Sequence, residues 1–195
     1  WLNDSLVSDK PTVQAADSML YWLENISRHG INPNLYSADS IRSGLQQIRT
    51  LQLQDGKTMN SLLADLEYQL TTAYLSYVCR LKFGFLPPER RWNDSIDRIP
   101  LKRCDMKFAL SALDSLRANP TAAFHWAQPS SRLYKKMQEE LVRVNDWGKT
   151  DTTDYYRDRL LLNLERERWQ YALDKGKKYV MANVAAFMLQ AVNEE

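Results

Sequence analysis

Apolar residues recur every three or four positions through most of the chain, a spacing typical of amphipathic helices. Gly30, Asp55-Gly56 and Trp147-Gly148 interrupt this pattern where helices are expected to end. Ser37 and Thr153 look like residues that begin helices, because their hydroxyls can accept a backbone N–H. The pattern therefore predicts helices over about 11–30, 37–54, 58–83, 105–118, 130–147 and 153–173, with a short helical turn at 120–126.

The helix predicted for 58–83 is the longest, and its apolar residues occupy more than one face. Leu75 and Val78 widen the main stripe, so this helix is expected to lie centrally and to contact several others. The main stripe consists of Met59, Leu62, Leu63, Leu66, Leu70, Ala73, Tyr77 and Leu81.

The segment 178–192 is ambiguous. The runs 179–181 and 187–189 suit β-strands, whereas Val180, Val184 and Phe187 also lie at helical spacing. Residue propensity by itself leans towards helix, because the segment is rich in Ala and Met.

Composition supports a mainly α fold that resembles a helical bundle. Six Gly and seven Pro in 195 residues supply few turns for a protein of many short strands. Lys and Arg are interspersed with Asp and Glu to give a net charge of +2, which argues against a nucleic-acid partner. No apolar run approaches the roughly 20 residues that span a bilayer.

Cys79 and Cys104 have neither CxxC spacing nor a nearby histidine, so a zinc site is not expected. Two small buried apolar side chains are the favoured interpretation. A disulfide remains the alternative, if the fold brings the two residues together in an oxidising compartment.

No catalytic, cofactor-binding or metal-binding residue is predicted from the pattern. His29 is expected to cap a helix C-terminus as a protonated imidazole. His125 lies in a short aromatic segment with Phe124 and Trp126 and is expected to have a packing role. Glu165 and Glu167 are expected to lie on a solvated face or to form pairs within the helix, and Glu165 is spaced for a local salt bridge to Arg168. Most of the six Trp and ten Tyr are expected to anchor the core, although a groove for sugars or peptides would also use such residues.

Several segments in order resemble the large murein L,D-transpeptidases. The most specific is similar to their NLERxRW signature and comprises Asn163, Leu164, Glu165, Arg166, Glu167, Arg168 and Trp169. Residues 178–189 resemble the first strands of their catalytic domain. Weaker similarities lie at 29–36 (HGINPNLY), 81–87 (LKFGFLP) and 129–137 (PSSRLYKKM), so that the resemblance extends over residues 1–189.

The resemblance implies an enzyme in which a cysteine thiolate attacks a peptidoglycan stem, releases D-alanine and forms a thioester that a second stem resolves as a 3-3 cross-link. Arg80 follows Cys79 and Asp105 follows Cys104, so neither fits the family's SHGC-type motif. Only about 145–155 fills the place of the relatives' peptidoglycan-binding domain, and Ala185 replaces a usual proline. We therefore expect a non-catalytic fragment, with a helical scaffold at 1–148, a connector and signature helix at 149–176, and the first strands of a truncated catalytic domain at 177–195.

The same resemblance implies the periplasm or cell envelope of a Gram-negative bacterium, with membrane anchoring through a removed N-terminal segment. The implied partners are peptidoglycan, through the parent protein, and the missing catalytic domain. A surface for substrate or for that domain is expected near Trp92, Trp126 and Tyr134.

The last segment, once cut from its sheet, is expected to be disordered, to pack on the helices, or to pair with a second copy as a homo-oligomer. Two other functions remain open. One is a helical protein-interaction module with no enzymatic role. The weaker one is a small helical enzyme that uses His29 or His125.

Overall fold

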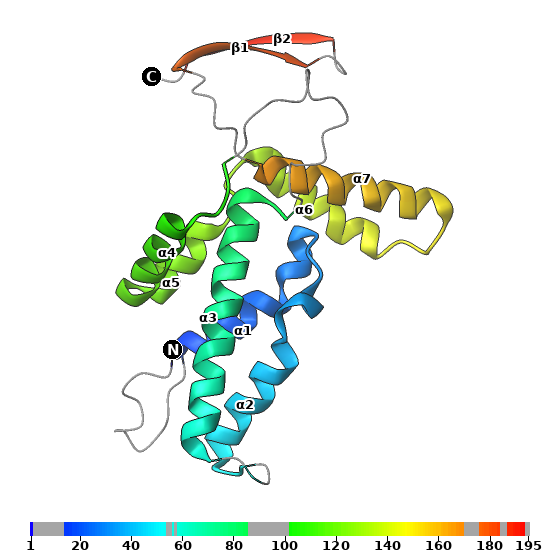
Figure 1. The fold of residues 1–195 in the computed structure, drawn as a ribbon. Coiled ribbons are helices and arrows are strands. Elements are labelled where there is room, and N and C mark those ends of the chain that lie inside the picture. The colour runs from blue at the N-terminus through cyan, green and yellow to red at the C-terminus, as the bar shows by residue number, and fades with distance from the viewer. Residues whose placement is uncertain are drawn as a thin grey trace, which may run out of the picture. The chain divides into compact units, whose positions relative to one another are not determined.

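The computed structural model describes residues 1, 14–53, 56, 58–85, 102–169, 176–183 and 187–193, which form a mainly α structure (Figure 1). The chain divides into two compact units, of which the first, called the helical body here, is Trp1–Leu86 with Arg103–Trp169. It contains α1 (Gln14–Glu24), α2 (Ala38–Thr50), α3 (Met59–Phe83), α4 (Met106–Ala118), α5 (Pro120–Ala127), α6 (Arg132–Asn145), α7 (Asp151–Arg168) and the 3₁₀ helices η2 (Ile26–His29) and η3 (Pro33–Tyr36).

Helix α3 is the central element of the helical body, as its sequence predicts (Figure 1). It begins at a capping box in which Thr58 and Ser61 each bond the other's backbone N–H. Helices on several sides bury its apolar residues, which explains why its stripe is wide. The buried residues are Leu62, Leu66, Leu70, Ala73, Tyr74, Tyr77, Val78 and Leu81.

Close packing of α2 against α3 depends on Gly44. A Cβ added at Gly44 would lie 2.7 Å from Cδ2 of Leu66, so a larger residue would push the two helices apart. Ile41, Leu45 and Ile48 continue this contact along the buried face of α2.

Helices α4 and α5 start at side-chain caps and enclose an aromatic centre. Asp105 accepts the N–H of Phe108 at 2.7 Å, and Asn119 accepts the N–H of Ala122 at 3.0 Å. Phe124 is fully buried and meets the rings of Trp1, Trp22, Tyr74 and Tyr77. Tyr74 donates its hydroxyl proton to the carbonyl of Ala112 at 3.0 Å, so these buried tyrosines are core anchors, as expected.

Helices α6 and α7 lie side by side near the C-terminal end of α3 (Figure 1). The predicted limits of α7, 153–173, are wrong at both ends. Thr150 is the N-cap, and Thr153 serves as its partner in the capping box. The helix ends at Arg168 because Trp169 adopts an extended backbone.

A disulfide joins Cys79, near the end of α3, to Cys104, just before α4. The favoured interpretation of two separate buried thiols is therefore wrong. Packing of α3 against α4 brings the Cα atoms to 5.4 Å, a separation that the sequence distance of 25 residues does not reveal.

The second unit is Pro87–Lys102 with Gln170–Glu195, and its described part is an antiparallel hairpin of β1 (Lys178–Asn183) and β2 (Met188–Asn193). Val180 pairs with Ala191, and Ala182 with Leu189. The helix favoured by residue propensity for 178–192 is wrong, and the strands implied by the resemblance are confirmed. The two strands pair with each other along one edge, an outcome absent from the three expected for this segment. Pairing with a second copy stays a prediction.

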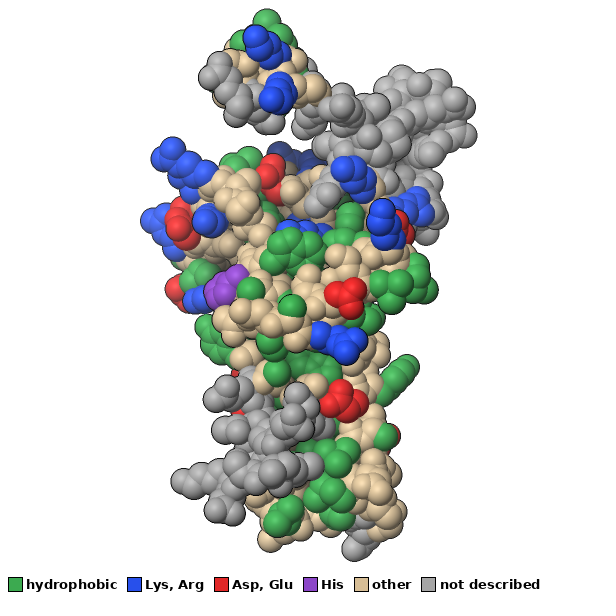
Figure 2. Space-filling model, turned by 90° about the vertical axis from the view of Figure 1, so that its left-hand side faces the viewer, with side chains coloured by type: hydrophobic (Ala, Val, Ile, Leu, Met, Phe, Trp, Pro, Cys, Tyr) green, Lys and Arg blue, Asp and Glu red, His purple; other side chains and the backbone are tan. Residues whose placement is uncertain are grey.

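On the face shown in Figure 2, Lys and Arg side chains of the helical body lie among Asp, Glu and uncharged residues and form no continuous stripe. Among the described residues, no helix has the length and apolar character needed to cross a bilayer.

Replacing both Cys79 and Cys104 with Ser is expected to lower the free energy of unfolding by about 3 kcal/mol, because the disulfide closes a loop of 25 residues in the unfolded chain. Urea unfolding followed by helical circular dichroism measures this difference. The wild-type protein under reducing conditions should match the double variant, and equal midpoints with and without reductant would contradict the expectation.

Candidate functional site: a buried polar cluster

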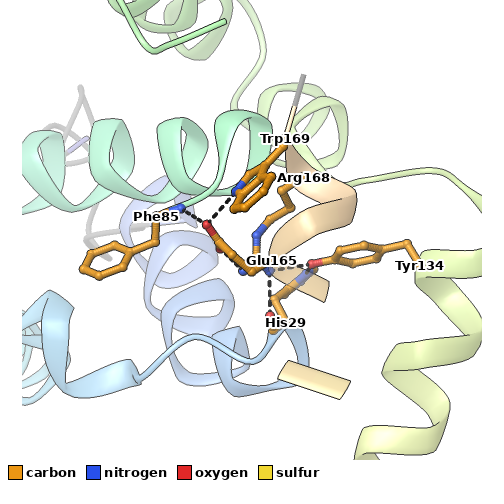
Figure 3. A network of polar contacts seen from close by, with 6 residues as sticks. All are labelled: His29, Phe85, Tyr134, Glu165, Arg168 and Trp169. Atoms are coloured by element: carbon orange, nitrogen blue, oxygen red, sulfur yellow. Dashed lines mark hydrogen bonds and ion pairs between the residues drawn. The ribbon is translucent and has the colours of Figure 1, made fainter. Parts of the chain in front are cut away.

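Five polar or amphipathic side chains from three parts of the chain meet inside the helical body (Figure 3). We call His29, Tyr134, Glu165, Arg168 and Trp169 the buried polar cluster. His29 ends η2, Tyr134 lies in the first turn of α6, and the other three lie at the end of α7. The cluster thus joins the start and the end of the helical body at one place.

Arg168 connects three elements through its guanidinium group. Its Nη1 donates to the carbonyl oxygen of His29 at 2.7 Å and to the hydroxyl oxygen of Tyr134 at 3.0 Å. Its Nη2 donates to Oε2 of Glu165 at 2.6 Å. Arg168 is only 4% exposed, so these contacts replace water around a charge that is costly to bury.

Glu165 is also enclosed, at 6% exposed, so of the two expected alternatives the solvated face is wrong. Its Oε1 accepts the backbone N–H of Phe85 at 2.6 Å and the indole N–H of Trp169 at 3.1 Å. The predicted local salt bridge to Arg168 is confirmed. Glu165 therefore fixes the end of α7 to the residue pair that follows α3.

His29 is neutral in this setting. Burial, with Arg168 and Arg28 nearby, lowers its pKa from 6.5 to about 4. The predicted role as a protonated helix cap is wrong, because the desolvation cost outweighs the small attraction of a helix end.

The hydrogen bonds also define which nitrogen of His29 carries the proton. The side-chain N–H of Gln138 lies 3.1 Å from Nδ1 of His29 and can only donate, so Nδ1 accepts from it. The Tyr134 hydroxyl, whose oxygen accepts from Arg168, lies 2.9 Å from the same nitrogen and therefore donates to it. Nδ1 is therefore an acceptor, and the proton of the neutral ring lies on Nε2.

Two glycines allow the backbone to approach α7. Gly30 and Gly84 both have positive φ, of 70° and 80°. A Cβ at Gly84 would lie 2.6 Å from Oε1 of Glu165 and 2.8 Å from the Trp169 ring, and a Cβ at Gly30 would lie 2.7 Å from Leu161. Neither site has room for a side chain.

Two of the three residues named for the predicted contact surface, Trp126 and Tyr134, belong to the described structure. Tyr134 is fully buried in the cluster, so its prediction as a surface residue is wrong. Trp126 is 44% exposed and stacks on Phe108, with Lys82 over its ring at 4.6 Å. Trp92 lies outside the described residues. His125 is exposed, and its ring meets Trp22 edge-on at 5.5 Å.

The chemistry of the cluster suits support rather than catalysis. Burial raises the pKa of Tyr134 and lowers that of His29, so neither group is poised to exchange a proton near neutral pH. Within the described ranges, no group of His, Cys, Asp and Glu could hold a metal ion. The arrangement instead holds the end of α7 against η2, α6 and the end of α3.

Sequence reasoning found these residues only as members of a signature. The NLERxRW match and the weaker matches at 29–36, 81–87 and 129–137 all contribute to the cluster or its glycines. A local signal was present in the i, i+3 spacing of Glu165 and Arg168. Their burial depends on segments more than 30 residues away, which no local pattern reveals.

A protein-family model described as Scaffold domain matches residues 1–141, more than half of the 195-residue chain. No curated protein and no solved structure matches the chain. His29, Phe85 and Tyr134 lie within the matched residues, whereas Glu165, Arg168 and Trp169 lie beyond them.

The substitution Glu165→Gln is expected to lower the free energy of unfolding by about 3 kcal/mol, because it leaves the buried Arg168 charge without its counterion. Glu140→Gln is the matched control, since Glu140 and Arg143 form the same i, i+3 pair at 2.6 Å on the surface. The control should lose less than about 1 kcal/mol. Equal losses in urea unfolding would contradict a special role for the buried pair.

Stability should fall as the pH is lowered from about 6.5 to about 4, because the unfolded chain protonates His29 while the folded protein does not. The loss due to His29 is about 1.4 kcal/mol for each pH unit, or about 3 kcal/mol in total.

The stability difference between wild type and His29→Gln, measured by urea unfolding from pH 7.5 to 4, isolates this contribution from that of the carboxylates. A difference between wild type and His29→Gln that does not change with pH would show that His29 is not held neutral.

Proposed function

The chain belongs to the Scaffold domain family, and on that basis we propose that it is the non-catalytic scaffold of a periplasmic L,D-transpeptidase that forms 3-3 cross-links in peptidoglycan. The observation that carries the proposal is the convergence of the four segments similar to those enzymes on the buried polar cluster. The residues of the NLERxRW signature therefore have a structural role, because three of them belong to the buried polar cluster.

That role is to fix the point at which the chain leaves the helical body. Trp169 directly follows α7 and donates a hydrogen bond to Glu165. Glu165 in turn accepts hydrogen bonds from Arg168 and from the N–H of Phe85. A following domain would therefore begin from a rigid end of helix rather than from a frayed one. Rigid support of this kind matters in catalysis because small misplacements of a reacting group are costly.

The hairpin supports the presence of further sheet in the parent protein. A two-stranded hairpin by itself is marginally stable in water. Paired residues share a face, and both faces of this hairpin expose apolar side chains, which is typical of strands buried on both sides of a larger sheet. The exposed apolar residues are Val180 and Leu189 on one face and Met181 and Met188 on the other.

The disulfide between Cys79 and Cys104 supports an oxidising location such as the periplasm. It also joins the chain's two cysteine sulfurs, so neither is a free thiolate nucleophile. The proposal therefore places the nucleophilic cysteine in a domain that follows this chain in the parent protein. That thiolate would attack the stem carbonyl, release D-alanine and pass the acyl group to an amine of a second stem.

The full-length protein encoded by the parent reading frame provides the test. It should contain an SHGC-type cysteine after Glu195, and its expression should raise the 3-3 cross-links found by muropeptide analysis. Glu165→Gln in that protein should reduce these cross-links at least about tenfold if misplacement of the catalytic domain follows loss of the cluster. Glu140→Gln should leave them unchanged.

A reading frame without a cysteine-bearing domain, or a full-length protein that forms no 3-3 cross-links, would overturn the proposal. The remaining candidate would then be a helical interaction module. An apolar groove of about 510 Å³ beside α7, lined by Ile31, Leu35, Phe85, Leu161 and Leu162 among others, favours that second function. Capture of a partner peptide that Leu35→Asp abolishes would support it.

A further inference from the structure

A second concave site lies on the helical body between α1, η2 and α6. Its volume is about 590 Å³, within the range of sites for small molecules. Helix α6 contributes residues at positions 135, 138, 139, 142 and 143, which form one face of that helix. Tyr21, Trp22 and Arg28 line the opposite side, and His29 contributes to the wall.

His29 offers this cleft a hydrogen-bond donor with no partner among the described residues. Its side chain is 6% exposed, and its Nδ1 is occupied by Tyr134 and Gln138. The structure gives no partner to Nε2 among the described residues, so its proton is available for a hydrogen bond. His29 lines the cleft, and its Nε2 is not among the enclosed polar atoms, so this N–H can bond to solvent or to an acceptor atom of a ligand there.

The charge around the cleft favours an anion. Arg28, Lys135 and Arg143 line it, against one carboxylate, that of Glu139. Arg143 is paired with Glu140, whereas Arg28 and Lys135 have no ion-pair partner among the described residues. Arg28 is close enough to His29 to contribute to the lowering of its pKa. Two cations and one N–H donor thus face the same space.

An apolar wall accompanies these polar groups. Tyr21 is 55% exposed and meets Trp22 edge-on at 5.7 Å. Trp22 is held in place because its ring stacks on the buried Phe124. A rigid aromatic pair beside a polar wall is typical of sites that take a small ligand with both apolar and charged parts.

We propose that this cleft binds a small ligand with a carboxylate group, which accepts the Nε2 proton of His29 and is neutralised by Arg28 and Lys135. The remainder of the ligand lies against Tyr21 and Trp22. A free peptide C-terminus and an acidic sugar share this chemistry. The site is built only from the helical body, so it does not depend on the function proposed above.

Titration of the intact chain, followed by the NMR signals of the His29 ring and the Trp22 indole, tests the site. The probes are N-acetyl-alanyl-alanine with its C-terminal amide, and glucuronate with its methyl ester. We expect at least one acid to bind with a dissociation constant of about 1 mM and to shift the His29 Nε2 signal. Its neutral counterpart should bind at least about tenfold more weakly, because the charged hydrogen bonds are lost.

Variants of exposed residues separate binding from folding. The double substitution Arg28→Gln with Lys135→Gln should weaken binding of the acid at least about tenfold. Arg132→Gln with Lys136→Gln is the matched control, since both residues are exposed cations of α6 outside the cleft. The control should bind like the wild type.

Binding of only the peptide acid or only the sugar acid would support the carboxylate site and identify its source. Equal binding of an acid and its neutral counterpart would overturn the proposal. So would unchanged binding in the Arg28 and Lys135 variant, or no shift of the His29 signal with either acid up to roughly 50 mM.

Discussion

The burial of one ion pair, Arg168 with Glu165, constrains the arrangement of the helical body more than any other contact in the cluster. Both side chains are almost fully enclosed, and charges removed from water must be compensated by well-placed partners. Those partners are the carbonyl of His29, the N–H of Phe85 and the hydroxyl of Tyr134. Because they belong to η2, the end of α3 and α6, the pair fixes three elements relative to α7.

Backbone geometry makes that burial possible. Gly30 and Gly84 follow two of these elements, and each leaves room that a Cβ would occupy. Their positive φ angles also turn the chain directly after η2 and α3. The two glycines therefore permit the close approach of the backbone to α7, and the ion pair stabilises that approach.

His29 contributes both to the buried polar cluster and to the cleft beside α1 and α6. One ring nitrogen accepts hydrogen bonds within the cluster, and the other is left for the cleft beside α1 and α6. A ligand in the cleft would thus touch a ring that also orients Tyr134 and, through it, Arg168. The titratable groups at this end of the body therefore serve to position elements of the fold.

Local sequence determined the helices, because hydrophobic periodicity and capping residues act within a few positions. Helices α3 and α4 follow their predicted ranges closely, and α7 differs at its start because Thr150 and Thr153 are equivalent candidates that cap each other. The hydrophobic pattern did not identify the hairpin. Its strands carry apolar residues on both faces, so neither the helical period nor the strand period is dominant. The resemblance, rather than propensity, gave the correct strands.

Tertiary structure decided which charges are buried and which cysteines meet. Glu140 with Arg143 and Glu165 with Arg168 have the same spacing and the same ion-pair distance, yet only the second pair is enclosed. The difference arises from residues 29, 85 and 134, which the sequence places far from α7 and the fold brings against it. The disulfide likewise depends on the packing of α3 against α4. The sequence specifies the helices through interactions between neighbouring residues, whereas the burial of a side chain depends on contacts between distant segments.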